Sequence, residues 1–169
     1  MGASLFVSVQ EGSAVRVCRD LVRLRTVSRM QFVDLTELVA ERVRRSGVVE
    51  GTVTVQSRHT TAAVLVNENE PLLIQDFEDR LEAWAPADAC YRHNDLEVRE
   101  GAPVDERPNG HAHARALLLG ASVSLNIAEG QLDLGEWQSV FLVELDGPRE
   151  RTLSVQVLGV TSDPRGRRA

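Results

Sequence analysis

The chain of 169 residues contains no lysine, and all 19 of its basic residues are arginine. The absence of lysine excludes Schiff-base chemistry, a lysine general base and the lysine of a Walker-type phosphate loop. A bound phosphate must therefore be held by arginine side chains, backbone N–H groups or a metal ion. The net charge of -6 argues against general nucleic-acid binding, because proteins of that class need a basic face.

Cysteine is also scarce, with only Cys18 and Cys90 in the chain. Two cysteines without Cys-x-x-Cys spacing exclude a disulfide scaffold and a thiolate zinc site, and they favour a reducing compartment. No segment approaches the roughly 20 apolar residues of a membrane span, and the first residues lack the basic start and long apolar run of a signal peptide. We therefore expect a cytoplasmic protein without a membrane partner.

Length and composition indicate one folded unit. The 169 residues and a hydrophobic content of 43% fit a single domain over residues 1–169, in which 162–169 have the composition of a frayed end. Apolar spacing and capping residues predict three helices, over 34–46, from Pro71 until Pro86 stops the helix, and over 109–120. Extended patterns predict strands over 5–9, 15–24, 52–56, 62–66, 122–127, 131–134, 138–145 and 152–160.

Turn sequences separate the later strands. Glu129 and Gly130 form one such turn, and Asp146, Gly147 and Pro148 form another. Both predict that the strands on either side are antiparallel neighbours. We therefore expect an α+β fold built on a largely antiparallel sheet with about three helices.

All four histidines fall in three short polar motifs, as His59, His93, His111 and His113. Imidazole titrates near neutral pH and is the commonest neutral metal ligand, so this grouping indicates a site. His59 is expected near a strand end, and His93 in the long loop 86–110. At the start of a helix, His111 and His113 point to opposite sides, and His113 is the better candidate for the site.

Two chemical interpretations of the cluster stay open. His59, His93 and His113 could ligate a transition metal with an open position, or they could act as acid and base on a bound anion. No His-x-x-x-His signature favours the first interpretation, and histidines that only form hydrogen bonds or caps are the alternative to both. The nearby carboxylates that could assist are Glu68, Asp95 and Glu144.

A second local hypothesis is an anion site at the start of the third helix. Gly110 and His111 offer backbone N–H groups there, and guanidinium groups are available from Arg107, Arg115 and Arg149. Separately, Trp137 and Gln138 could place an aromatic face and an amide against a flat heterocycle, although a tryptophan at a strand start is more often a core or interface residue.

Six motifs occur in an order that covers most of the chain, at 57–63, 67–70, 109–113, 118–122, 130–138 and 144–149. Together they resemble the YjbQ family. The resemblance implies a compact α+β domain, a homotrimer, and a cleft near a subunit boundary. It implies that His59, His93 and His113 are the catalytic residues and metal ligands. Around them, the supporting positions are Asn67, Glu68, Trp137, Gln138 and Glu144. With Arg115 from the anion hypothesis, we expect the contacts to a cofactor or ligand to come from Asn67, Glu68, Arg115, Trp137 and Gln138.

The family carries the label secondary thiamine-phosphate synthase, a transferase activity that joins thiamine pyrimidine pyrophosphate to thiazole phosphate. This coupling releases pyrophosphate and calls for Mg²⁺ with oxygen ligands, whereas three imidazoles suit zinc or another transition metal. The chain has neither lysine nor an acidic cluster for such a reaction. We therefore expect the synthase activity only as a side reaction on a small phosphorylated molecule.

Two other classes compete with an enzyme. In one, the protein is a non-catalytic metal- or small-anion-binding protein with a structural or sensing role. In the other, the histidines hold an oligomer together. A pH–rate profile that depends on His113 distinguishes the enzyme from the binding protein, and weakened assembly of His→Ala variants identifies the third class.

Overall fold

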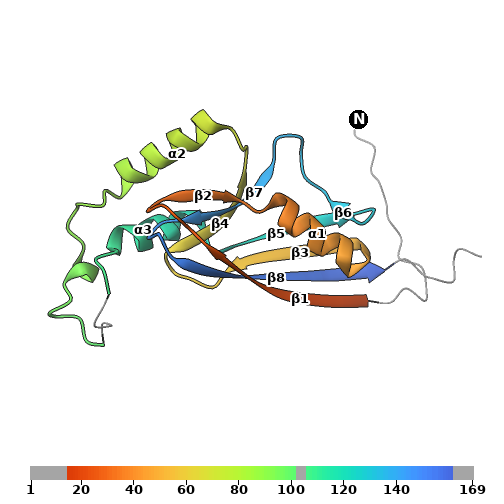
Figure 1. Cartoon of the computed structure of the whole chain (residues 1–169), viewed down its shortest axis with the longest axis horizontal. Helices are drawn as coiled ribbons and strands as arrows, with labels where there is room; N and C mark the ends of the chain where they lie inside the picture. The colour runs from red at the N-terminus through yellow and green to blue at the C-terminus, as the bar shows by residue number, and fades with distance from the viewer. Residues whose placement is uncertain (1–14, 102–105, 162–169) are drawn as a thin grey trace, which may run out of the picture.

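The computed structural model describes residues 15–101 and 106–161, which form two antiparallel sheets and three α-helices (Figure 1). Sheet A has the order β1 (Val15–Arg25), β8 (Glu150–Thr161), β3 (Val48–Ser57), β5 (Ser122–Ala128) and β6 (Gln131–Leu132). Sheet B has the order β2 (Gln31–Asp34), β7 (Ser139–Glu144) and β4 (Ala62–Asn67). The helices are α1 (Thr36–Ser46), α2 (Pro71–Trp84) and α3 (Gly110–Leu119), with a 3₁₀ turn η1 (Arg92–Asn94). The expected α+β fold with a largely antiparallel sheet is confirmed.

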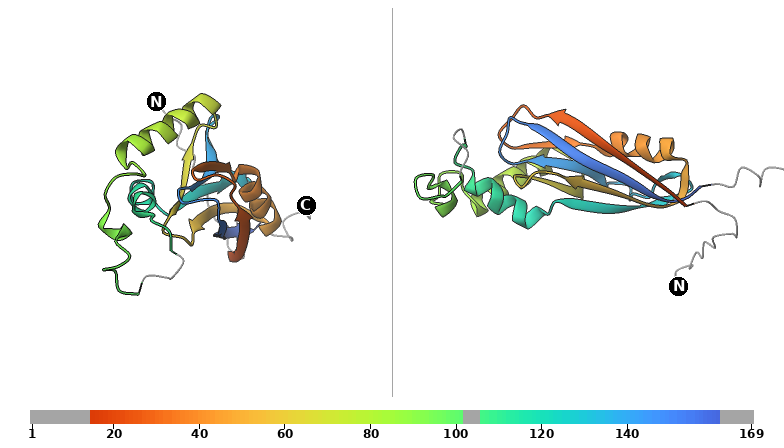
Figure 2. Two further views of the ribbon diagram at one scale, coloured as in Figure 1. Left: turned by 60° about the vertical axis from the view of Figure 1, so that its left-hand side comes forward. Right: turned by 90° about the horizontal axis from the view of Figure 1, so that it is seen from below.

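Sheet B lies in the middle of the molecule, between sheet A and the helices α2 and α3 (Figure 2). Strand β7 shows this most clearly. Val140 and Leu142 pack in a core shared with β3 and β8, whereas Phe141 and Val143 pack in a second core with α2 and α3. Because both faces of β7 are buried, its sequence is a continuous apolar run without the alternation of a half-exposed strand.

The ends of the helices follow local chemistry. Gly47 ends α1 with φ +70°, a left-handed conformation that favours glycine. Pro71 occupies the first turn of α2, and the carboxylate of Glu70 accepts hydrogen bonds from the N–H groups of Leu72 and Leu73. The predicted positions of all three helices are confirmed to within a few residues.

The strand connections correct one expectation. Strands β5 and β6 do pair as a hairpin across Glu129 and Gly130. In contrast, β7 pairs in sheet B and β8 in sheet A, so the turn at residues 146–148 joins two sheets and not two neighbours. Strand β2 was not predicted, because its four residues are too short for a periodic pattern. The strand expected over 5–9 and the tail 162–169 lie outside the described residues.

No helix in the described ranges 15–101 and 106–161 has the length and apolar character needed to span a membrane.

Candidate functional site

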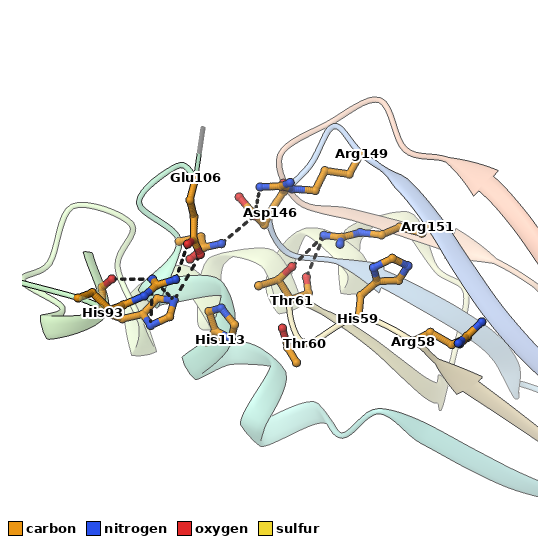
Figure 3. A pocket seen from close by; sticks show the side chains of 12 residues that line it. Arg58, His59, Thr60, Thr61, His93, Glu106, His113, Asp146, Arg149 and Arg151 are labelled. Atoms are coloured by element: carbon orange, nitrogen blue, oxygen red, sulfur yellow. Dashed lines mark hydrogen bonds and ion pairs between the residues drawn. The ribbon is translucent and has the colours of Figure 1, made fainter. Parts of the chain in front are cut away.

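A pocket of about 560 Å³ opens where the loop between α2 and α3 meets the ends of β3 and β7 and the start of β8 (Figure 3). These segments lie at one end of the molecule (Figure 1). This volume falls within the range of roughly 300–1,000 Å³ that is typical of small-molecule sites. Its lining is polar and contains three of the four histidines. The lining residues are Arg58, His59, Thr60, Thr61, His93, Arg99, Glu106, Asn109, His113, Asp146, Arg149 and Arg151.

The turn after β3 positions His59. The hydroxyl of Ser57 accepts a hydrogen bond from the His59 N–H and so tightens the turn. Regular pairing of β3 with β8 ends at Ser57 and Leu153, and one residue beyond it the Thr152 carbonyl accepts the Arg58 N–H at 3.1 Å. The Thr152 N–H does not return to the backbone of this turn but donates to Nε2 of His59 at 2.8 Å. The side chain thus extends the hydrogen bonding of the sheet.

This hydrogen bond fixes the tautomer of His59. A backbone N–H can only donate, so Nε2 is unprotonated and the proton of the neutral ring lies on Nδ1. Burial lowers the pKa of His59 below 6.5, and the positive charge of Arg151 lowers it further, against a smaller opposing effect of Glu144. His59 is therefore a neutral hydrogen-bond donor through Nδ1 near neutral pH.

A buried ion pair lies directly behind the pocket. Arg151 on β8 is 3% exposed and Glu144 on β7 is fully buried. Both oxygens of the Glu144 carboxylate accept hydrogen bonds from the guanidinium, through Nε at 2.6 Å and through Nη2. Thr61 also accepts from Nη2, through its hydroxyl oxygen at 3.1 Å. Within the described residues Nη1 has no hydrogen-bond partner, yet protein does not enclose it.

Glu144 also holds neighbouring backbone in place. Its carboxylate accepts hydrogen bonds from the hydroxyl of Thr26 at 2.9 Å and from the N–H groups of Leu145 and Asp146. Burial acts to raise the pKa of Glu144, but the hydrogen bonds from Arg151 and the Asp146 N–H outweigh it and hold the pKa below the ordinary value of 4.5. The carboxylate is therefore ionised and fixes Arg151 in one orientation.

The other end of the pocket is formed by two histidines and a carboxylate. The rings of His93 and His113 meet edge to face with centroids 4.6 Å apart. Glu106 lies 3.8 Å from Nε2 of His93 and pairs with Arg99, which also contacts that Nε2 at 3.0 Å. Burial lowers the pKa of His113, and the neighbouring His93 lowers it further, so His113 is neutral near neutral pH.

His111 points away from the pocket, because it is two residues before His113 on a helix and so lies on nearly the opposite side. It is 1% exposed, lies against the ring of Tyr91, and neither of its ring nitrogens has a hydrogen-bond partner among the described residues. Asn109 is the residue directly before α3, but its side chain does not cap the helix. Asn94 from η1 accepts the Gly110 N–H at 2.8 Å, whereas the amide of Asn109 donates to Asp146.

The three histidines do not converge on one point. His59 uses Nε2 for Thr152 at one end of the pocket, while His93 and His113 lie together at the other end (Figure 3). In the described part of the chain, no group of three or more histidine, cysteine, aspartate or glutamate side chains is arranged to hold a metal ion. The expected set of three imidazole ligands is therefore not assembled in this structure.

The residues expected to contact a cofactor are absent from the lining of this pocket. Arg115 is 2% exposed and donates to the carbonyl of Ala85, so it fixes the end of α2. Trp137 is 66% exposed in a loop, and the Gln138 amide accepts the Gly135 N–H. Asn67 is exposed at the end of β4, and its side chain accepts the N–H of Glu68. Within one chain these five residues, which include Glu68, do not line the pocket with His59, His93 and His113.

Sequence reasoning missed Arg151, Arg99, Glu106 and Asp146. The sequence does contain a signal for Arg151. It lies two residues before Leu153 and four before Val155 on the same strand, so its side chain lies on the same core-facing side. Glu144 ends the buried apolar run of β7 and is a charged residue at a buried position. An acid and a base at core-facing positions predict a pair. No comparable pattern identifies Arg99 or Glu106, because both lie in the irregular loop.

The fold and the pocket together define a class: a small α+β protein with two stacked antiparallel sheets and an arginine- and histidine-lined pocket at one end. Within this class, the family model described as "UPF0047 protein YjbQ-like" matches residues 20–160. The chain belongs to the YjbQ family.

Relatives and solved structures agree with this assignment. A UPF0047 protein of Methanothermobacter thermautotrophicus is 42% identical over 136 residues, which cover 80% of this chain and 88% of the relative. The UPF0047 protein YugU of Bacillus subtilis is 30% identical, with coverage of 82% and 97%. The crystal structure of a YbjQ-like protein of unknown function from Sulfolobus solfataricus superposes with a TM-score of 0.78 at 34% identity, covering 86% of this chain and 99% of that one.

Proposed function

We propose that the pocket binds the anionic group of a small phosphorylated molecule. The observation that carries the proposal is Arg151, a buried guanidinium that Glu144 orients and whose Nη1 is left open at the pocket. His59 adds an Nδ1–H donor beside it, and Arg58 adds an exposed guanidinium. Arg151 and His59 are held in place by their hydrogen bonds, so these two donors lose little conformational freedom when a phosphate binds.

The net charge of the lining supports the same conclusion. Four arginines line the pocket against two carboxylates, Glu106 and Asp146. Glu144 behind the pocket neutralises one further positive charge. One positive charge therefore remains in excess while the whole chain carries -6, so the pocket is a local basic site on an acidic protein.

Calorimetric titration with inorganic phosphate tests this proposal. Arg58→Gln removes an exposed donor at the pocket and is expected to weaken phosphate binding about fivefold or more. Arg44→Gln on α1 is the matched control, because it removes another exposed arginine far from the pocket (Figure 1) and should leave the affinity unchanged. Absence of phosphate binding, or an equal effect of the two variants, contradicts the proposal.

Thiamine phosphate formation is the candidate reaction that the family label supplies, and we propose it as a side reaction of this pocket. The assay supplies pyrimidine pyrophosphate and thiazole phosphate to the purified protein, with and without divalent metal, beside the double variant His59→Ala/His113→Ala. Activity that is lost in the variant supports chemistry at the pocket. Equal activity in both proteins, or none in either, contradicts it and favours a non-catalytic binding protein.

We also propose that the chain forms a homotrimer through the outer face of sheet A. Among the described residues no helix covers this face, and its apolar side chains Val15, Val17, Leu21 and Leu158 are 42 to 70% exposed. Exposed apolar residues that gather on one sheet face are typical of an interface between subunits.

A further inference from the structure

The two ends of the pocket offer different chemistry to a ligand. Figure 3 shows Arg58, His59 and Arg151 on one side, and His93, Glu106 and His113 on the other, with Thr60 and Thr61 between them. The volume of about 560 Å³ is far larger than a phosphate group requires, so a ligand bound at the first end has room to extend to the second.

The first end can only donate hydrogen bonds. Arg58 and Arg151 have no acceptor atom, and His59 has committed its one acceptor nitrogen to the Thr152 N–H. A group bound here must therefore consist of acceptors. A phosphate monoester satisfies this condition fully, because its terminal oxygens accept from every direction.

The second end contains one donor, Arg99, whose guanidinium is already bound to Glu106 and to the carbonyl oxygen of His93, and it offers acceptors to a ligand. Neither ring nitrogen of His113 has a hydrogen-bond partner in the described ranges, and protein does not enclose either of them. The ring is neutral, because burial lowers its pKa, so one of its nitrogens is a free acceptor. Glu106 adds a carboxylate whose side chain is 14% exposed. A ligand gains most here by presenting a donor.

We propose that the ligand of this pocket is a phosphate monoester that carries a hydroxyl or amino group at the end remote from the phosphate, and that His113 accepts a hydrogen bond from that group. This inference rests on the proposed function, because it assumes that the phosphate occupies the end formed by Arg58, His59 and Arg151. It assigns His113 the role of a specificity-determining residue. A neutral imidazole in this place can also accept the proton of the hydroxyl, as a general base does.

Four probes test the inference by calorimetric titration of the full chain near neutral pH: inorganic phosphate, propyl phosphate, glycerol phosphate and aminopropyl phosphate. Glycerol phosphate or aminopropyl phosphate is expected to bind about fivefold tighter than propyl phosphate, the gain of one hydrogen bond in a partly buried site. Which of the two binds tighter identifies the donor as hydroxyl or amine.

Two variants of His113 assign the effect to this side chain. His113→Phe removes the acceptor and should abolish the preference while the affinity for propyl phosphate stays within about twofold, since a neutral ring is replaced by a ring of similar size. His113→Gln keeps an acceptor oxygen and should restore part of the preference. Thermal unfolding of both variants identifies any loss of folding.

The failures of the two proposals are distinguishable. If wild-type protein binds none of the four probes, both the proposed function and the inference are contradicted. If phosphate and propyl phosphate bind but the donor-bearing esters bind no more tightly, the inference alone is overturned. A preference that persists unchanged in His113→Phe overturns the assignment to His113.

Discussion

His111 and His113 are two residues apart on α3 and have opposite environments. His113 lines the pocket, whereas His111 is buried against Tyr91 with two ring nitrogens that have no partner in the described part of the chain. A polar side chain without partners in a core is costly to bury, and a charged one costs more. Protonation of the buried His111 is therefore expected to lower the stability of the fold at low pH.

Stability is expected to decrease as the pH falls below 6.5, and His111 contributes to this decrease. Burial lowers the pKa of His111, and the charges of Arg115 and Arg29 lower it further, against the opposing effects of Asp146 and Glu82. The unfolded chain then binds a proton that the folded chain does not, so stability is full above pH 6.5 and is lost as the pH falls toward the folded-state pKa. His111→Phe should flatten this part of a plot of unfolding free energy against pH. An unchanged slope would contradict the assignment.

The Glu144–Arg151 pair is expected to be essential for stability. Glu144→Gln leaves the Arg151 guanidinium buried without a counter-charge, which should lower the free energy of unfolding by about 3 kcal/mol in urea denaturation. Glu37→Gln is the control, because it breaks an exposed ion pair with Arg44 and should have no measurable effect. The double variant Glu144→Gln/Arg151→Met should recover part of the loss. Equal stability of Glu144→Gln and wild type would refute the role of the pair.

At the level of elements, α3 and η1 are held together by close packing. A Cβ at Gly110 would lie 2.5 Å from Cβ of Tyr91 and 3.1 Å from the Asn94 oxygen that caps α3. Gly110→Ala must therefore push η1 away, at a cost of about 1–3 kcal/mol. Hydrogen exchange should accelerate over residues 91–99 while β7 stays protected. Gly135→Ala meets nothing closer than 3.5 Å and serves as the control. Unchanged protection in Gly110→Ala would show that η1 does not depend on this contact.

Elements with a strong local signal could be predicted from the sequence, and those that depend on distant partners could not. Pro71 and Gly47 mark helix ends through backbone chemistry that needs no tertiary contact, and the helices predicted to end at residue 46 and to begin at residue 71 do so. The apolar run of β7 identifies a strand but not the two layers that cover it. The position of His59 beside β8 depends on pairing between residues 93 positions apart, which no local pattern contains.

At the level of the whole molecule, the outer face of sheet A is expected to mediate assembly. Val17 and Leu158 are directly opposed across β1 and β8, and both are exposed. Leu158→Glu places a charge in that face and should convert the proposed trimer into monomers in sedimentation analysis, because a buried unpaired charge is costly. Leu117→Glu on α3 is the control, since Leu117 is 83% exposed and lies outside the sheet. A wild-type chain that sediments as a monomer contradicts the proposal.

The order of strands in sheet A has a consequence for synthesis. β8 lies between β1 and β3 and pairs with both along most of its length, although it is the last strand of the described chain. The strands β1 and β3 therefore leave the ribosome early, but β8, the strand that pairs with both of them, is synthesised much later. The nascent chain must keep these edges unpaired during most of translation, a period in which exposed strands are prone to aggregate and chaperones bind them. Production of this protein should thus depend on the rate at which β8 is translated.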